Sequence, residues 1–340
     1  MEAGAGTWNV APRVSGDRHP AAREIPLIPV RPVLYTLTAN PCIMCVVSCS
    51  VIRASVLGYC MGVRRAVEIA EKCLETYKEN PVYSFGPLIH NRSALAALEE
   101  KGLKLLESVD DARTLDKAPV VIIRAHGIPP ETRHALEEKG CIIQDATCPR
   151  VLANQKKAAS YAAKGFTVII AGDKNHGEVT GLAGCVRTAA AAPEKECCLL
   201  VDSPSDAASL DVTGCGGDVV LISQTTISPS EYAEIADVLK KRIPHLEVLD
   251  TVCPATQERQ NALDELCKRA EGVLVIGGRN SANTQRLFSS ARQKCAHAAH
   301  IEKAGDIPAE FFSLNTVGIT AGASTPDFVI DAVETRLTSV

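Results

Sequence analysis

Six short apolar runs, most of them rich in β-branched residues, recur after residue 50 and narrow the possible folds. Each run is followed by a turn rich in Gly or Ser and then by a segment with helix-like spacing. Uninterrupted apolar strands are typical of parallel sheets that are covered on both faces. The repeated strand–turn–helix order therefore predicts several small α/β lobes. The runs are "VIRASVLGYC" (51–60), "PVVIIRAHG" (119–127), "FTVIIAGDKNHG" (166–177), "DVVLISQTT" (218–226), "GVLVIGGRNSAN" (272–283) and "TVGITAGAS" (316–324).

Length and charge limit the class of protein further. At 340 residues the chain exceeds one ordinary hydrophobic core, which favours two or three lobes. Hydrophobic residues make up 46% of the chain and aromatic residues only 4%, so we expect cores of Val, Ile, Leu and Ala. The net charge of −4 argues against a nucleic-acid partner, which requires a clustered basic surface. An anionic small substrate is compatible with it, because a local site can be positive on a mildly acidic protein.

The first 48 residues differ in composition from the rest. Residues 1–32 are rich in Pro, Gly and Ala, which predicts a disordered extension over residues 1–48. Residues 33–52 carry no charge over the length of a membrane span, but Asn40-Pro41 and several hydroxyl residues argue against one, and we expect no membrane partner. The extension has no signal-peptide pattern, and it is too poor in Ser and too acidic for a plastid transit peptide. We therefore expect a bacterial cytoplasmic protein.

Two segments, "DATCPRV" (145–151) and "DTVCPAT" (250–256), share one cysteine-bearing pattern, with an acidic residue three positions before the cysteine and Pro directly after it. Cys148 and Cys253 are each followed by Pro, which suits the first turn of a helix. Cys60, in "GYCMGVRRA", also stands where a helix begins. A thiol at a helix N-terminus ionises more readily, and thiolate is the form that binds iron or zinc. Three such cysteines from distant segments predict one metal centre, although a single cysteine of this kind is more often a buried structural thiol.

The remaining cysteines give a different signal. Fourteen cysteines fall short of the share that marks a disulfide scaffold, so we expect a reducing compartment and mostly free thiols. "PCIMCVVSC" places Cys42, Cys45 and Cys49 at spacings similar to a metal motif, but its apolar surroundings and the lack of a nearby fourth ligand argue against a site there. A structural zinc site is closed by four ligands. Three cysteines instead favour an iron–sulfur centre with one iron open as a Lewis acid.

Polar side chains follow the predicted strands where each strand ends. In open parallel sheets, ligands bind beyond the carboxyl ends of the strands. His, Ser and Asn side chains, with backbone amides of Gly turns, form a pocket for an anion, and a carboxylate there can pass a proton. Each residue alone is compatible with a structural role; together they predict a site. They are His90, His126, His176, Glu178, Thr225, Thr226, Ser281, Asn283 and Ser324.

Nine blocks in unbroken order, over residues 53–332, resemble the LytB/IspH family of 4-hydroxy-3-methylbut-2-enyl diphosphate reductases. This resemblance implies three small α/β lobes with mostly parallel sheets, arranged as a pseudo-threefold cloverleaf around a central 4Fe–4S cluster. We place the lobes at residues 49–147, 148–252 and 253–340. The blocks are "GYCMGVRRA", "IHNRSALAALEEKGL", "RAHGIPPETRHAL", "DATCPRV", "NHGEVTGLAG", "SQTTIS", "DTVCPAT", "RNSANTQRL" and "TAGASTPD".

The same resemblance implies the reaction and the role of each residue. The substrate is reductively dehydroxylated to isopentenyl and dimethylallyl diphosphate, the last step of the non-mevalonate isoprenoid pathway. Electrons come from an external one-electron donor such as ferredoxin or flavodoxin. The open iron binds the allylic hydroxyl, Glu178 supplies the proton, and Thr225 lies near that hydroxyl. The implied cluster ligands are Cys60, Cys148 and Cys253, and the implied diphosphate ligands are His90, His126, His176, Thr226, Ser281, Asn283 and Ser324.

One departure and two alternatives accompany this resemblance. Ala282 stands where the family often has a second Ser, which implies one hydrogen bond fewer to the diphosphate. A structural zinc protein, with three cysteines and one histidine as ligands, is one alternative; colourless protein that contains zinc and no acid-labile sulfide would favour it. The other is a non-redox diphosphate-binding hydrolase or transferase, in which a Cys148→Ser variant would stay active.

Overall fold

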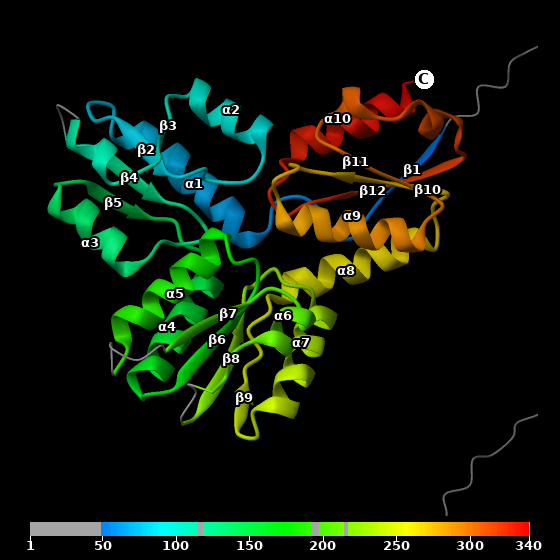
Figure 1. The fold of residues 1–340 in the computed structure, drawn as a ribbon. Coiled ribbons are helices and arrows are strands. Elements are labelled where there is room, and N and C mark those ends of the chain that lie inside the picture. The colour runs from blue at the N-terminus through cyan, green and yellow to red at the C-terminus, as the bar shows by residue number, and fades with distance from the viewer. Residues whose placement is uncertain (1–48, 115–117, 192–196, 214–216, 340) are drawn as a thin grey trace, which may run out of the picture. The chain divides into compact units, whose positions relative to one another are not determined.

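The computed structural model describes residues 49–114, 118–191, 197–213 and 217–339. Residues Val46–Val340 form one compact unit. Cys42, Cys45 and the predicted extension over residues 1–48 lie outside the described residues. None of the described helices combines the length and the apolar character that crossing a membrane requires. Three four-stranded parallel sheets, each covered by helices, make up this unit (Figure 1).

The sheet that we call lobe B comes first along the chain, with the strand order β3-β2-β4-β5. All of its neighbouring strands are parallel. Its strands are β2 (Val82–Phe85), β3 (Lys104–Leu106), β4 (Val120–Ile123) and β5 (Ile142–Asp145). Its helices are α1 (Met61–Thr76), α2 (Arg92–Glu100) and α3 (Pro130–Glu138), with the 3₁₀ helix η1 (Asp110–Thr114).

Lobe C follows, with the order β7-β6-β8-β9 and again only parallel pairs. Its strands are β6 (Thr167–Ala171), β7 (Cys198–Val201), β8 (Val219–Ser223) and β9 (Leu246–Val248). Its helices are α4 (Pro149–Ala163), α5 (Gly177–Ala189), α6 (Pro204–Ser209) and α7 (Pro229–Arg242).

Lobe A combines the C-terminal region with the first described strand, in the order β1-β12-β10-β11. Its strands are β10 (Gly272–Ile276), β11 (His297–Ile301), β12 (Thr316–Ala321) and β1 (Ser50–Arg53). Its helices are α8 (Pro254–Cys267), α9 (Ala282–Lys294) and α10 (Asp327–Thr338), with the 3₁₀ helices η2 (Ala304–Asp306) and η3 (Ala309–Ser313).

The three sheets share one topology. In lobes B and C the first strand lies between the second and the third, and the fourth lies outermost beside the third. Lobe A has the same order if β10, β11 and β12 count as its first three strands and β1 as its fourth. The predicted pseudo-threefold arrangement of three α/β lobes is therefore confirmed.

The predicted first lobe, residues 49–147, differs from the structure at its start. Ser50 pairs with Thr316 of β12, so β1 belongs to lobe A. The run 51–60 also holds less strand than its composition suggests, because β1 ends at Arg53. β1 is an edge strand that is only partly buried, so the apolar pattern there says little about its partner. The boundaries at residues 148 and 253 stay predictions; each falls at a cysteine that directly precedes a helix of the next lobe.

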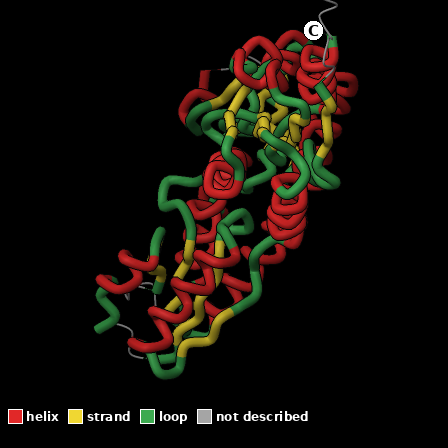
Figure 2. Tube along the Cα trace, turned by 90° about the vertical axis from the view of Figure 1, so that its right-hand side faces the viewer, coloured by secondary structure: helices red, strands yellow, loops and turns green. Residues whose placement is uncertain are grey.

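Each sheet is buried on both faces, which explains the apolar runs. In lobe C, Val168 and Ile170 pack beneath α4 and α5 in one cluster, while Ile169 and Leu221 face another cluster under α7. Side chains on successive strand residues point to opposite faces, so a strand covered on both sides must be apolar throughout. In the tube view the strands lie between helices in the same way (Figure 2).

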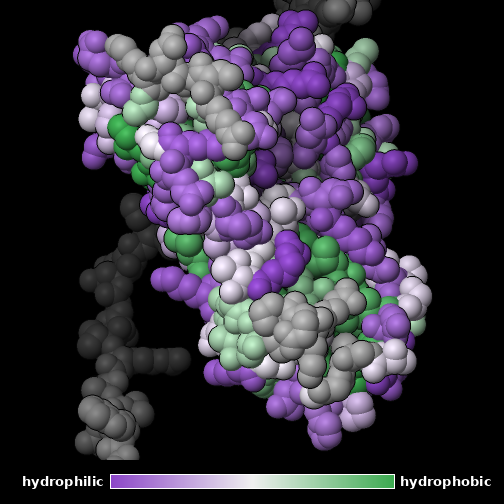
Figure 3. Space-filling view, turned by 60° about the vertical axis from the view of Figure 1, so that its left-hand side comes forward, coloured by the Kyte–Doolittle hydropathy of each residue, from purple (hydrophilic) through white to green (hydrophobic). Residues whose placement is uncertain are grey.

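The outer surface is mostly polar. Hydrophilic side chains cover most of the face seen in Figure 3. Smaller hydrophobic patches lie mainly in the lower part of that view. Among the described residues, the large hydrophobic side chains that stay exposed are Met61, Leu105 and Phe328.

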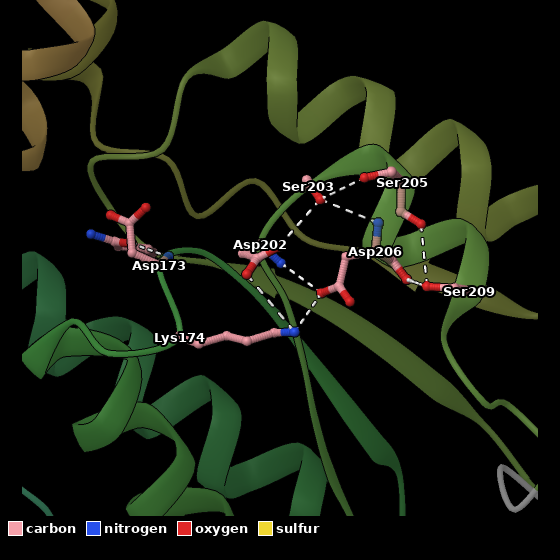
Figure 4. A network of polar contacts seen from close by, with 8 residues as sticks. Asp173, Lys174, Asp202, Ser203, Ser205, Asp206 and Ser209 are labelled. Carbon is pink, nitrogen blue, oxygen red and sulfur yellow. Dashed lines mark hydrogen bonds and ion pairs between the residues drawn. The ribbon is translucent and has the colours of Figure 1, made fainter.

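Polar contacts hold the loop that follows β6. Lys174, in this loop, lies 2.8 Å from a carboxylate oxygen of Asp206 in α6, and the same oxygen accepts a hydrogen bond from the amide of Asp202 (Figure 4). The hydroxyl of Ser203 accepts from the amide of Asp206 and caps α6. The start of α5, three residues beyond Lys174, is therefore fixed to the β7–α6 turn.

Close packing of α8 on lobe A depends on Gly318 in β12. A Cβ at this position would lie 2.7 Å from Cγ of Leu266 in α8. We expect Gly318→Ala to destabilise the protein by about 1–3 kcal/mol through overpacking, measured as the free energy of unfolding in a denaturant titration. Gly305→Ala is the control, because no atom lies within 4 Å of a Cβ there. Equal stability of the two variants would contradict this account.

Candidate functional site

One cavity of about 100 Å³ is lined by all the residues that the sequence predicts for the site. It lies among the ends of strands from lobes A, B and C. The predicted residues that line it are Cys60, His90, His126, Cys148, His176, Glu178, Thr225, Thr226, Cys253, Ser281, Asn283 and Ser324.

The three lobes supply equivalent parts of the wall. After the first strand of its sheet, lobe B places His90, lobe C places His176 and Glu178, and lobe A places Ser281 and Asn283. After the third strand, the lining residues are His126 in lobe B, Thr225 and Thr226 in lobe C and Ser324 in lobe A. The first and third strands are neighbours at which the strand order reverses, the point where open α/β sheets bind ligands.

The three cysteines follow the fourth strand of each sheet and directly precede α1, α4 and α8. Each cysteine amide donates to a carbonyl beyond the third strand of the lobe that it leaves. Cys60 donates to Ala323 at 3.1 Å, Cys148 to Ala125 at 2.9 Å and Cys253 to Thr225 at 2.9 Å. The chain thus passes from one lobe to the next at each cysteine, which turns all three thiols toward the cavity.

Close packing at Gly62 brings two of these cysteines together. A Cβ at residue 62 would lie 2.6 Å from Sγ of Cys148. The turn that begins α1 after Cys60 therefore lies directly against the Cys148 thiol. Three thiols on one wall, with a glycine beside them, fit an iron–sulfur cluster with three cysteine ligands.

The expectation of a readily ionised thiol is wrong for Cys253. Burial raises the pKa of the Cys253 thiol, and the amide of Ala255 and the nearby Arg150 offset this only in part. Desolvation thus outweighs the start of α8, which acts in the opposite direction. Metal binding at Cys253 would have to displace a proton.

Three imidazoles gather on another part of the wall. The ring centroids are 5.0 Å apart for His90 and His126, 4.7 Å for His126 and His176, and 6.0 Å for His90 and His176. Burial lowers the pKa of all three, to about 4 for His176, and neighbouring rings lower the pKa of His126 and His176 further. The imidazoles are therefore neutral at neutral pH.

The cluster offers hydrogen-bond donors to a ligand. Nδ1 of His176 accepts from the amide of Glu178 at 3.2 Å, so the neutral ring carries its proton on Nε2. Nδ2 of Asn283, a donor, is buried without a partner among the described residues. One nitrogen from each of the three rings lies within 4.8 Å of the others, close enough to hold a metal ion or an anion. The free donors fit an anion.

Glu178 is buried at the start of α5 and bound at both oxygens. Oε1 accepts from the amide of Thr225 at 2.7 Å, and Oε2 accepts from its hydroxyl at 2.8 Å. Burial raises the pKa of Glu178 to about 7, although the two hydrogen bonds act to lower it. A carboxyl with such a pKa can hold and give up a proton near neutral pH.

Two serines have additional structural roles. The Ser281 hydroxyl accepts from the amide of Thr284 at 3.3 Å and caps α9. The Ser324 hydroxyl donates to the carbonyl of His90 at 3.1 Å and so joins lobe A to lobe B. Ser281 keeps its hydroxyl proton free for a ligand, whereas Ser324 uses its proton between the lobes.

Sequence reasoning missed the cations in and beside the cavity wall, Arg150 among them. Arg259 in α8 lines the cavity, is only 2% exposed, and donates to the carbonyl of Ala321 at 3.0 Å. Arg124 follows β4 directly, two residues before His126. A charged residue at the end of an apolar strand is the signal that could have identified Arg124.

Comparisons with known proteins identify the family to which the chain belongs. The sequence profile of the family described as LytB protein matches residues 51–338. The 4-hydroxy-3-methylbut-2-enyl diphosphate reductase of Treponema denticola is 47% identical over 84% of this chain and 98% of its own length, and that of Caldanaerobacter subterraneus is 38% identical over 83% and 94%.

Two solved structures share the fold. The E-1-hydroxy-2-methyl-but-2-enyl-4-diphosphate reductase of Plasmodium falciparum has a TM-score of 0.75 and 28% identity, over 84% of this chain and 86% of its own. The (E)-4-hydroxy-3-methyl-but-2-enyl diphosphate reductase described as the terminal enzyme of the non-mevalonate pathway has a TM-score of 0.65 and 32% identity, over 86% and 100%. This chain therefore belongs to the LytB protein family of 4-hydroxy-3-methylbut-2-enyl diphosphate reductases.

Proposed function

We propose that this chain reductively removes the hydroxyl of (E)-4-hydroxy-3-methylbut-2-enyl diphosphate to give isopentenyl and dimethylallyl diphosphate. The observation that carries the proposal is the single cavity in which three thiols, three neutral imidazoles and one buried carboxyl meet. Reductive C–O cleavage needs a source of electrons, a proton for the leaving hydroxyl and a pocket for the charged end of the substrate. The cavity wall offers residues for each.

Cys60, Cys148 and Cys253 would hold a 4Fe–4S cluster with one open iron site. When bound there, the cluster supplies electrons and a Lewis acid for the substrate hydroxyl. The chain itself holds the thiols in place by the three amide–carbonyl bonds between lobes. Arg259 adds a buried positive charge beside them, which compensates thiolate charge.

The imidazole side of the cavity would bind the diphosphate. Neutral His176 presents Nε2–H, Asn283 presents its unpaired amide, and Ser281 presents its hydroxyl proton. His90, His126, Thr226 and Ser324 complete this wall. Donors that are fixed before the ligand arrives bind an oxyanion without reorganisation.

Glu178 and Thr225 would deliver the proton. In the carboxylate form Glu178 accepts both hydrogen bonds of Thr225. Once Glu178 is protonated, the Thr225 hydroxyl can accept from it and donate onward to the leaving hydroxyl. The electrons would come from an external one-electron protein donor such as ferredoxin or flavodoxin, in the bacterial cytoplasm.

Removal of one thiol tests the cluster. We expect Cys148→Ser to lose most of its iron and acid-labile sulfide and nearly all reductase activity, because serine is a poorer ligand for iron–sulfur clusters. Iron and sulfide assays after anaerobic reconstitution, with an electron paramagnetic resonance spectrum, provide the measurement. Cys197→Ser is the control, since this half-buried thiol packs against the lobe C core. An active Cys148→Ser variant would favour a non-redox function, and a zinc-containing colourless wild type would favour a structural metal site.

Removal of the carboxyl tests the proton donor. We expect Glu178→Gln to keep its iron content and substrate binding but to lose turnover by about 100-fold or more, the usual contribution of a general acid. In the wild type the acid form dominates below the pKa of about 7, so turnover should be full below that pH and fall as the pH rises through it. Single-turnover rates between pH 6 and 9 measure both effects. Glu234→Gln, on the exposed side of α7, is the control; a Glu178→Gln variant with normal rates would remove Glu178 from this role.

The departure at Ala282 gives a gain-of-function test. Ala282 lines the cavity as the first residue of α9, next to Ser281 and Asn283. We expect Ala282→Ser to lower KM for the diphosphate substrate about 2- to 10-fold, the net value of one added hydrogen bond. Steady-state kinetics measure the change, with the exposed Ala296→Ser as control. An unchanged or raised KM would show that the pocket has no unmet acceptor at this position.

A further inference from the structure

Arg124 is held between two glycines from different lobes. A Cβ at Gly86, after β2, would lie 2.9 Å from Nη1 of Arg124, and a Cβ at Gly177, the first residue of α5, would collide with Nη2. Gly86 also adopts a φ of 70°, which favours glycine. The guanidinium fills the space that these two glycines leave. The packing of lobe B against lobe C therefore fixes the position of the guanidinium.

In the part of the chain that the structure describes, no group neutralises this cation. Among the described residues Arg124 forms no ion pair, and its buried Nε has no hydrogen-bond partner. Burial lowers the pKa of Arg124, yet a guanidinium stays protonated in proteins. Arg124 as a whole is partly buried, and a charge withdrawn from water without a partner is costly and normally has one. We therefore expect a bound anion to supply the partner that the described residues lack.

The surroundings of Arg124 would repel another cation and attract an anion. It lies beside the N-terminus of α5, which carries partial positive charge. It is also the cation that acts on His90, His126 and His176 alike and contributes to their lowered pKa values. Asp173, the carboxylate that acts on His176, is already engaged by Arg286 at 2.9 Å.

Arg124 does not line the cavity, whereas all three imidazoles do. We propose that Arg124 is a positioning residue that supplies permanent positive charge behind the three imidazoles and so tightens binding of the diphosphate group. In this arrangement the histidines act as neutral N–H donors and Arg124 carries the charge. Salt screens partly buried charges only weakly. The guanidinium of Arg124 therefore attracts the diphosphate even though the three imidazoles lie between them. The inference rests on the proposed diphosphate site.

The test compares variants that keep or remove the charge. We expect Arg124→Met to raise KM for the substrate and the dissociation constant of inorganic pyrophosphate about tenfold, with kcat within about threefold of wild type. Arg124→Lys keeps the charge and should stay within about threefold of wild type in both constants. Arg187→Met, on the exposed end of the same helix α5, removes an equal charge and should change neither.

Pyrophosphate binding, measured by calorimetry, separates this inference from the proposed reaction. If Arg124→Met keeps wild-type iron content and binds pyrophosphate as tightly as wild type, the proposal is overturned. If Arg124→Met fails to fold, Arg124→Lys decides, and a tenfold loss of pyrophosphate affinity in that folded variant would also overturn it. A wild type that binds pyrophosphate in an Arg124-dependent way but lacks reductase activity would refute the reaction and support the role of Arg124.

Discussion

Three backbone hydrogen bonds govern the architecture around the cavity. In each, a cysteine amide donates to a carbonyl at the end of the third strand of one lobe, and the helix after that cysteine packs into the next lobe. Neutral hydrogen bonds contribute modestly to stability, but a buried amide or carbonyl left without its partner is costly. Any displacement of one lobe would leave such groups unpaired. The thiols, the strand ends and the shape of the cavity thus depend on one another.

Local patterns in the sequence are sufficient for most of the site. The dipeptides Cys148-Pro149 and Cys253-Pro254 each predict the start of a helix, and α4 and α8 begin at these two prolines. His126 and Thr225 follow apolar runs long enough to identify β4 and β8 as buried strands. In a parallel sheet the end of a strand also fixes which edge a residue occupies. Such features need no knowledge of distant contacts.

What the sequence could not supply depends on contacts between distant segments. β1 carries no signal that its partner is β12 rather than a strand of the following lobe, because its edge position leaves it half exposed. The raised pKa of Cys253 follows from burial that only the assembled lobes create. Arg124 is the clearest case: Gly86 and Gly177 shape its surroundings, and none of the described residues forms an ion pair with it.

The pairing of Ser50 with Thr316 has a consequence for biosynthesis. Lobes B and C consist of contiguous segments, and domains generally fold in order as the chain leaves the ribosome. Lobe A needs β12 before β1 has a neighbour, so its sheet closes only after lobes B and C have been made. Cys60 and Ser324 reach the cavity through that last step. The cavity therefore lacks its third wall until β12 and the residues after it have been made.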